Sequence, residues 1–104
     1  MPNWSVSPTS LTWTPGVPLS TYVILTVNLP LPLTLKSIAY LGNYPKSFTW
    51  SSSGCAVGAV CKPGEYRVIV TFVPGNNPQP PTGTLVFTDT YGQVQKVQLT
   101  GFIG

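Results

Sequence analysis

The chain has 104 residues, of which only 7% are charged, so it forms one domain with an unusually uncharged surface. Its net charge of +3 results from five basic and two acidic residues, and because the basic residues are scattered, the chain lacks the basic patch of nucleic-acid-binding proteins. Histidine, the usual general base, is absent, which argues against catalysis. No segment reaches the roughly 18 apolar residues of a membrane span, which argues against membrane insertion.

The first half of the chain predicts short strands separated by turns that contain proline and glycine. Apolar and β-branched runs indicate four strands, at Trp4–Ser7, Leu11–Trp13, Tyr22–Asn28 and Leu33–Leu41. The connector before the fourth strand reads Leu29, Pro30, Leu31 and Pro32. Proline cannot donate a ladder hydrogen bond, so we expect this connector to lie outside the sheets.

The second half continues the same pattern and predicts four more strands, at Phe48–Trp50, Tyr66–Val73, Leu85–Thr88 and Val94–Phe102. In the second of these, Val68, Val70 and Phe72 should face one way and Arg67 and Thr71 the other. No segment shows a helical period, and 12 prolines and 10 glycines punctuate the strands. We therefore predict that residues 1–104 form a single all-β domain, an immunoglobulin-like antiparallel β-sandwich of about seven to eight short strands.

A family pattern runs through seven segments in order: Ser5–Trp13, Val23–Asn28, Leu33–Ile38, Phe48–Cys55, Pro63–Pro74, Gly83–Asp89 and Val97–Gly101. The first reads SVSPTSLTW and the fifth reads PGEYRVIVTFVP. Together they resemble the ASH-type immunoglobulin-like modules, also called hydin-like or choice-of-anchor D modules. The resemblance implies structural and adhesive roles, as in bacterial surface proteins, phage virion components and ciliary or centrosomal scaffolds. It implies no catalytic residues.

The two cysteines, Cys55 and Cys61, enclose five small or apolar residues. We interpret them as a structural disulfide, which would stabilise the fold by about 2 kcal/mol; two thiols or a reactive pair are the alternatives. Without histidine, and with two acidic residues, the chain lacks the ligands of a standard metal site, so we expect neither metal nor cofactor. A disulfide would indicate an extracellular or virion setting, or a thermophile cytoplasm.

The two acidic residues, Glu65 and Asp89, are the remaining candidates for catalysis. A pair of carboxylates could serve glycoside hydrolysis. Glu65 lies in the turn before one predicted strand and Asp89 at the end of another, so turn hydrogen bonding and solvation are the simpler interpretation. We predict that the protein is not an enzyme.

Proline-rich loops and aromatic residues in turns are the candidates for contact with a partner. Tyr44 and Tyr91 lie in predicted turns, where we expect them to be exposed. The run Pro78-Gln79-Pro80-Pro81 has the form of a Pro-x-x-Pro ligand, although a stiffened loop explains it more simply. The candidate contact residues are Leu29, Pro30, Leu31, Pro32, Tyr44, Trp50, Asn76, Asn77, Pro78, Pro80, Pro81 and Tyr91.

The tryptophans allow two interpretations. In the first, Trp13 and Phe48 belong to the core, and Trp4 and Trp50 seal the ends of the sandwich. In the second, the tryptophans join four tyrosines in a sugar-stacking face, as in carbohydrate-binding modules.

The functional prediction is a non-enzymatic structural protein whose partners are other proteins, including copies of itself. Low charge, a start methionine and no export signal favour a virion component, such as a capsid decoration or tail accessory subunit. The first alternative is an adhesion or spacer module excised from a larger surface protein, and the second is a carbohydrate-binding module. The expected location is the virion surface or the cell exterior.

Overall fold

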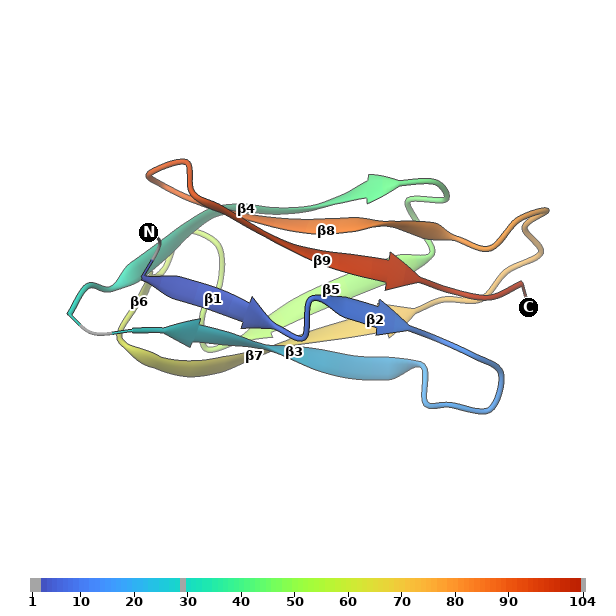
Figure 1. Ribbon diagram of the computed structural model, residues 1–104, viewed down its shortest axis with the longest axis horizontal. Coiled ribbons are helices and arrows are strands. Elements are labelled where there is room, and N and C mark those ends of the chain that lie inside the picture. Colours follow the sequence, from blue (N-terminus) through green and yellow to red (C-terminus); the bar gives the residue numbers. More distant parts are fainter. Residues whose placement is uncertain (1–2, 29, 104) are drawn as a thin grey trace.

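The computed structural model describes residues 3–28 and 30–103, which form two facing β-sheets (Figure 1). Within these residues the chain forms nine strands and no helix. The strands are β1 (Trp4–Ser7), β2 (Ser10–Thr12), β3 (Ser20–Val27), β4 (Leu33–Gly42), β5 (Phe48–Ser53), β6 (Val60–Cys61), β7 (Gly64–Phe72), β8 (Thr82–Asp89) and β9 (Val94–Thr100).

The strand order is that of an immunoglobulin-like sandwich. One sheet has the order β1-β3-β7-β5 and the other has the order β2-β9-β8-β4-β6. These orders correspond to the A-B-E-D and G-F-C sheets of an immunoglobulin domain, with β2 and β6 added at the two edges of the second sheet. The predicted all-β sandwich is confirmed.

Three details of the sheets differ from the prediction. β2 pairs with β9 in parallel, with Leu11 opposite Leu99, so the pairing is not wholly antiparallel. β5 continues three residues past Trp50 because its backbone stays paired with β7 as far as Ser53. β6 pairs with the start of β4 and has only two residues, too few for an alternating pattern to be recognised in the sequence.

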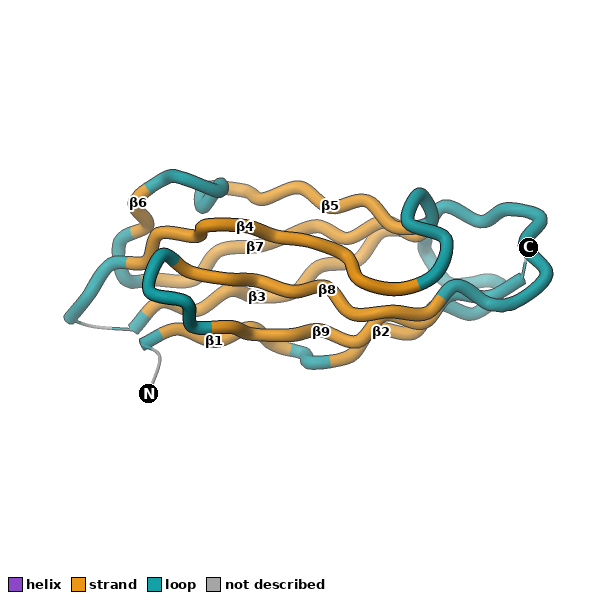
Figure 2. Tube along the Cα trace, turned by 90° about the horizontal axis from the view of Figure 1, so that it is seen from above, coloured by secondary structure: helices purple, strands orange, loops and turns teal. Residues whose placement is uncertain are grey.

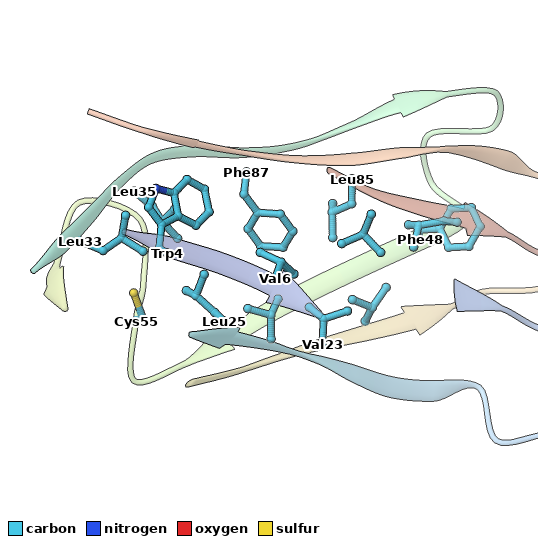
Figure 3. Packing of buried hydrophobic residues seen from close by; sticks show 14 of the residues in the cluster. Trp4, Val6, Val23, Leu25, Leu33, Leu35, Phe48, Cys55, Leu85 and Phe87 are labelled. Atoms are coloured by element: carbon cyan, nitrogen blue, oxygen red, sulfur yellow. The ribbon is translucent and has the colours of Figure 1, made fainter. Parts of the chain in front are cut away.

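Side chains that alternate along the strands fill the space between the sheets (Figure 3). Along β7, Val68, Val70 and Phe72 are buried. Arg67 is exposed and Thr71 is half-buried on the outer face of the same strand, which confirms the predicted alternation. The period of two residues therefore places one side of each strand in the core.

The aromatic residues expected in the core are buried there. The rings of Trp13 and Phe48 lie 5.4 Å apart between centroids, and both side chains are 2% exposed. Trp4 belongs to the core itself: it is 1% exposed and lies at the end of the core that also holds Leu33 and Leu35 (Figure 3).

The loops gather at the two ends of the sandwich, which measures 45 × 23 × 20 Å along its principal axes (Figure 2). One end, called here the groove end, carries residues 30–32, 54–63 and 90–93. The opposite end, called the proline end, carries residues 13–19, 43–47 and 73–81. The contact residues predicted from the sequence are thus divided between two ends of the molecule.

Gly101 provides a test of the core packing at the proline end. It is buried, and a Cβ atom built on it would lie 2.5 Å from Cε1 of Phe72, whose ring is held between other aromatic rings. We expect Gly101→Ala to lower the free energy of unfolding by about 1–3 kcal/mol in urea denaturation, because the core must shift. The matched control is Gly75→Ala, whose Cβ would meet only ordinary contacts, and we expect it to change stability by less than about 0.5 kcal/mol. Equal effects of the two substitutions would contradict this account.

Candidate functional site

An open groove of about 440 Å³ lies at the groove end. Its apolar lining includes Leu31, Pro32, Val60 and Tyr91. The exposed fraction is 89% for Tyr91, 70% for Val60 and 59% for Leu31. Neighbouring apolar side chains with this exposure indicate a contact site, because burying them against a partner removes apolar surface from water. The groove is the candidate functional site.

Three segments that are distant in the sequence build the groove. The connector before β4 supplies Leu31, whose carbonyl oxygen accepts a hydrogen bond of 2.7 Å from Nδ2 of Asn3. β6 supplies Val60, which pairs with Thr34 of β4. The β8–β9 turn supplies Tyr91, and its Thr90 backbone N–H donates to the carbonyl oxygen of Thr34 over 3.1 Å. Pairing with β4 and the Thr90 hydrogen bond therefore hold β6 and the turn to the same strand, and the Asn3 side chain holds the connector that leads into it.

The buried carboxylate of Asp89 fixes the β8–β9 turn. Asp89 is 2% exposed, and its Oδ1 accepts hydrogen bonds from the backbone N–H groups of Tyr91 at 2.9 Å and Gln93 at 2.8 Å. Its Oδ2 accepts a hydrogen bond of 2.9 Å from the indole N–H of Trp4. Gly92 completes the turn with a φ of 83°, which an L side chain rarely adopts. The side chain of Tyr91 is therefore held out from a turn anchored in the core.

The predicted role of Asp89 is confirmed in one respect and wrong in another. Turn hydrogen bonding is present, but the carboxylate is buried in the core where solvation was expected. Two signals in the sequence pointed to this arrangement. An Asp ahead of a Thr-Tyr-Gly turn can bond the backbone two residues on, and a buried Trp needs a partner for its N–H.

The predicted disulfide between Cys55 and Cys61 is confirmed, and the alternative with two thiols is wrong. Both residues are buried, and their Cα atoms lie 5.5 Å apart. The enclosed loop is also held by a hydrogen bond of 2.9 Å from the Gly58 N–H to the carbonyl oxygen of Leu35. The disulfide therefore fixes β6 beside the groove, and it indicates an oxidising environment.

The two acidic residues do not form a carboxylate pair. Glu65 is exposed on the outer side of β7, whereas Asp89 points from β8 into the core. Because they lie on opposite sides of the four-stranded sheet, their carboxyl groups cannot converge on one substrate. Among the described residues there is also no group of three His, Cys, Asp or Glu side chains that could hold a metal ion.

The proline-rich loop lies at the opposite end of the sandwich. Pro74, Asn76, Pro78 and Pro80 are exposed there, and Asn77 is half-buried. Pro81, which was predicted as a contact residue, is buried and is not presented to a partner. Its carbonyl oxygen instead accepts a hydrogen bond from the Gly101 N–H at 2.8 Å.

Asn43 holds this loop against the β4–β5 turn. Its Oδ1 accepts a hydrogen bond from the Thr82 N–H at 2.7 Å, and its Nδ2 donates to the carbonyl oxygen of Pro80 at 3.4 Å. The Tyr40 hydroxyl donates to the carbonyl oxygen of Asn43 at 2.9 Å, and burial raises the pKa of Tyr40 above its ordinary value. Both ends of the sandwich therefore present loops fixed by side-chain hydrogen bonds.

The remaining candidates from the sequence lie in different places. Leu29 lies outside the described residues. Pro30 is exposed at the groove end. Trp50 faces the interior from β5 and is half-buried against the core. Tyr44 was expected to be exposed, but it is half-buried in the β4–β5 turn with a φ of 48°. Val60 was missed because β6 is too short to be recognised in the sequence.

The aromatic residues do not share one face. Trp4 and Trp13 are buried in the core. Tyr22 lies on the outer face of the four-stranded sheet, with the Arg67 guanidinium 4.7 Å above its ring. Tyr91 is exposed at the groove end. This spread does not favour the predicted sugar-stacking face, which needs several exposed rings in one plane.

The described part of the chain contains no helix long and apolar enough to cross a membrane.

Comparisons with known proteins identify no family for this chain. No family model matches it, and no curated protein matches it. Among solved structures, the secreted serine protease VesC from Vibrio cholerae is similar in fold, with 11% sequence identity and a TM-score of 0.48. The match covers 90% of this chain and 21% of that protein, so this chain spans about a fifth of its length. A likeness this distant carries no argument about activity.

Replacing the buried carboxylate tests how the groove end is held. We expect Asp89→Asn to lower the free energy of unfolding by about 1–3 kcal/mol, because the amide turns an N–H group toward one of the three donors. Chemical denaturation measures the change. The matched control is Glu65→Gln, the same substitution at the exposed acidic residue, and we expect it to alter stability by less than about 0.5 kcal/mol.

A double-mutant cycle shows which donor is affected. Trp4→Phe removes the indole N–H that bonds Oδ2. We expect the effects of Asp89→Asn and Trp4→Phe to be non-additive by about 0.5–3 kcal/mol, because the two groups share one hydrogen bond. Strict additivity would show that the indole N–H contributes nothing to the anchoring of Asp89.

Removal of the disulfide should loosen β6. We expect the double substitution Cys55→Ser with Cys61→Ser to lower the free energy of unfolding by about 2 kcal/mol, the value for a short closed loop. Reducing agent should lower the melting temperature of the wild type and leave the double variant unchanged. Hydrogen exchange should quicken at Gly58, whose N–H bonds the carbonyl oxygen of Leu35, before it quickens at Val68. If reducing agent left the melting temperature of the wild type unchanged, the disulfide would have no structural role.

Proposed function

We propose that this protein is a non-enzymatic structural protein that binds neighbouring subunits of an assembly through its ends. The observation that carries the proposal is the groove, where Leu31, Val60 and Tyr91 are exposed together on a rigid sandwich. A protein that worked alone would gain nothing from keeping three apolar side chains in water at one place.

The rigidity of the groove supports a binding role. The Asp89 carboxylate, the disulfide and the backbone hydrogen bonds fix its three segments before any partner arrives. Binding to a preformed surface loses less conformational entropy than binding to mobile loops, so a modest contact area can suffice.

Composition supports an assembly as the setting. Only 7% of the residues are charged, and the outer faces of both sheets consist largely of Ser and Thr. Such a surface repels its neighbours weakly and loses little hydration when they pack against it. Together with the resemblance to ASH-type modules, this favours a virion component, either a capsid decoration protein or a tail accessory subunit. The oxidising environment indicated by the disulfide suits a location on a virion or outside a cell.

An adhesion or spacer module of a larger surface protein would use the same geometry. The two settings differ in where the protein is found. Immunogold electron microscopy of the source organism and its lysate, with antibody raised against residues 1–104, distinguishes them. Regular labelling of isolated particles is expected for a virion component, whereas label confined to the cell envelope would overturn this part of the proposal.

Incorporation into those particles should depend on the groove. We expect Tyr91→Ala to reduce the particle-bound fraction several-fold with little change in stability, since the exposed ring is removed while the backbone N–H that bonds Asp89 remains. The matched control is Tyr22→Ala, which removes an exposed ring from the outer face of β3, outside the groove lining. If Tyr91→Ala were incorporated to the same extent as the wild type and Tyr22→Ala, the groove would have no role in assembly.

A further inference from the structure

We propose that the free edge of β5 (Phe48–Ser53) binds an extended, acidic segment of a partner protein, which joins the four-stranded sheet as a further strand. β5 is the last strand of that sheet, and Figure 2 shows it as the outermost strand on its flank of the sandwich. No residue of β5 lines the groove among the described residues. The contact is therefore separate from the groove and goes beyond the proposed function.

The hydrogen bonds next to β5 show which of its backbone groups face away from the sheet. The Val73 N–H donates to the carbonyl oxygen of Ser47 at 2.7 Å, and this pair continues the register of β5 with β7. Hydrogen-bonded pairs alternate along an antiparallel ladder. The N–H and C=O groups of Phe48, Trp50 and Ser52 therefore point away from β7.

Trp50 and Ser52 form the accessible part of this edge. Phe48 is 2% exposed, so its backbone is covered, whereas Trp50 and Ser52 are half-buried. The residues between and before them, Thr49 and Ser51, are exposed. An unpaired row of N–H and C=O groups is a template for an extended chain, which satisfies both kinds of group at once. The backbone chemistry of the edge thus selects a strand as the occupant.

The sequence of β5 does not oppose such pairing. FTWSSS contains no proline and no charged side chain, and its register with β7 runs without a bulge. The opposite edge of the same sheet differs. β1 has only four residues, and the carbonyl oxygen of Trp4 accepts a hydrogen bond of 3.2 Å from Nε2 of Gln95 on β9. Of the two edges of this sheet, β5 is the one that stays open.

The side chains of β5 favour a strand in which apolar and polar residues alternate. Trp50 packs against the core from its margin and is only half-buried. An apolar side chain directly opposite on the added strand would cover this ring and remove apolar surface from water. Thr49 and Ser51 lie on the outer face, where polar side chains of the added strand would meet them.

Charge favours an acidic segment over a second copy of this chain. Lys46 lies in the turn before β5, Lys36 is exposed on β4, and Lys62 follows β6. Figure 2 shows β4 and β6 on the same flank as β5. The exposed acidic residue, Glu65, lies on β7 ahead of the residues that pair with β5. Basic side chains around an uncharged strand attract an acidic segment and repel a copy that carries the same lysines.

Amide hydrogen exchange followed by NMR tests this inference. In the free protein, exchange should be slow at Thr49 and Ser51, which bond β7, and fast at Trp50 and Ser52. The probe is a short peptide of sequence EVTVTVE. At about 1 mM we expect it to slow exchange at Trp50 and Ser52 several-fold, because main-chain hydrogen bonds supply the affinity. The control peptide KVTVTVK should have a several-fold smaller effect, because it carries the same charge as the flank.

Ser52→Pro is the decisive variant. Proline removes the N–H that faces away from β7 and leaves the ladder with β7 intact, so the unfolding transition should resemble that of the wild type. We expect the acidic peptide to lose its effect on Trp50 in this variant and to keep it in the matched control Ser52→Ala, which retains the N–H. A second form of the test leaves the protein unchanged. The acidic peptide N-methylated at its central valine keeps its charge but loses the N–H opposite Trp50, and it should not bind.

Three results would overturn the inference: no slowing of exchange at Trp50 and Ser52 by the acidic peptide, equal slowing by the lysine peptide, or undiminished binding of the N-methylated peptide. Slower exchange at these amides as the concentration of the protein alone rises would also overturn it, since a second copy would then occupy the edge. The groove is intact in all of these samples. Incorporation of Tyr91→Ala into particles therefore tests the proposed function separately.

Discussion

The buried carboxylate of Asp89 holds the groove end of this sandwich together. It bonds the indole of Trp4 at the start of the chain and two backbone N–H groups of the β8–β9 turn, so one side chain joins β1 of one sheet to the hairpin of the other. A buried charge without partners would strongly destabilise the fold. Three donors satisfy this one, and every other buried polar side-chain atom among the described residues also has a partner. The groove can be rigid because a polar anchor lies beneath it.

The fold was readable from the sequence wherever side chains repeat with a period of two. The runs in β3 and β7 alternate over eight or nine residues, and their inward faces, such as Val23, Leu25, Val68 and Val70, are fully buried. β6 was missed because it has only two residues and its place depends on pairing with β4, which leaves no local pattern. The parallel pairing of β2 with β9 was missed for a similar reason, since hydrophobic alternation does not encode strand direction.

The candidate site was readable only in part. Composition identified Pro30, Leu31, Pro32 and Tyr91 as exposed loop residues, but it could not show that the connector and the β8–β9 turn lie at the same end. It also grouped them with residues 76–81, which the structure places at the far end of the long axis. Local sequence specifies whether a residue lies in a turn. Which turns become neighbours is decided by the order of strands in the two sheets.

The bulge in β4 has a consequence for how copies can pack side by side. β6 covers only Leu33 and Thr34, which leaves the rest of β4 as a free sheet edge. The register of β4 against β8 shifts between Leu35 and Ser37, and the extra residue there is the exposed Lys36. A bulge and a lysine at an edge both oppose the addition of a further strand. Fusion with the sheet of a neighbouring molecule is thereby discouraged along this edge.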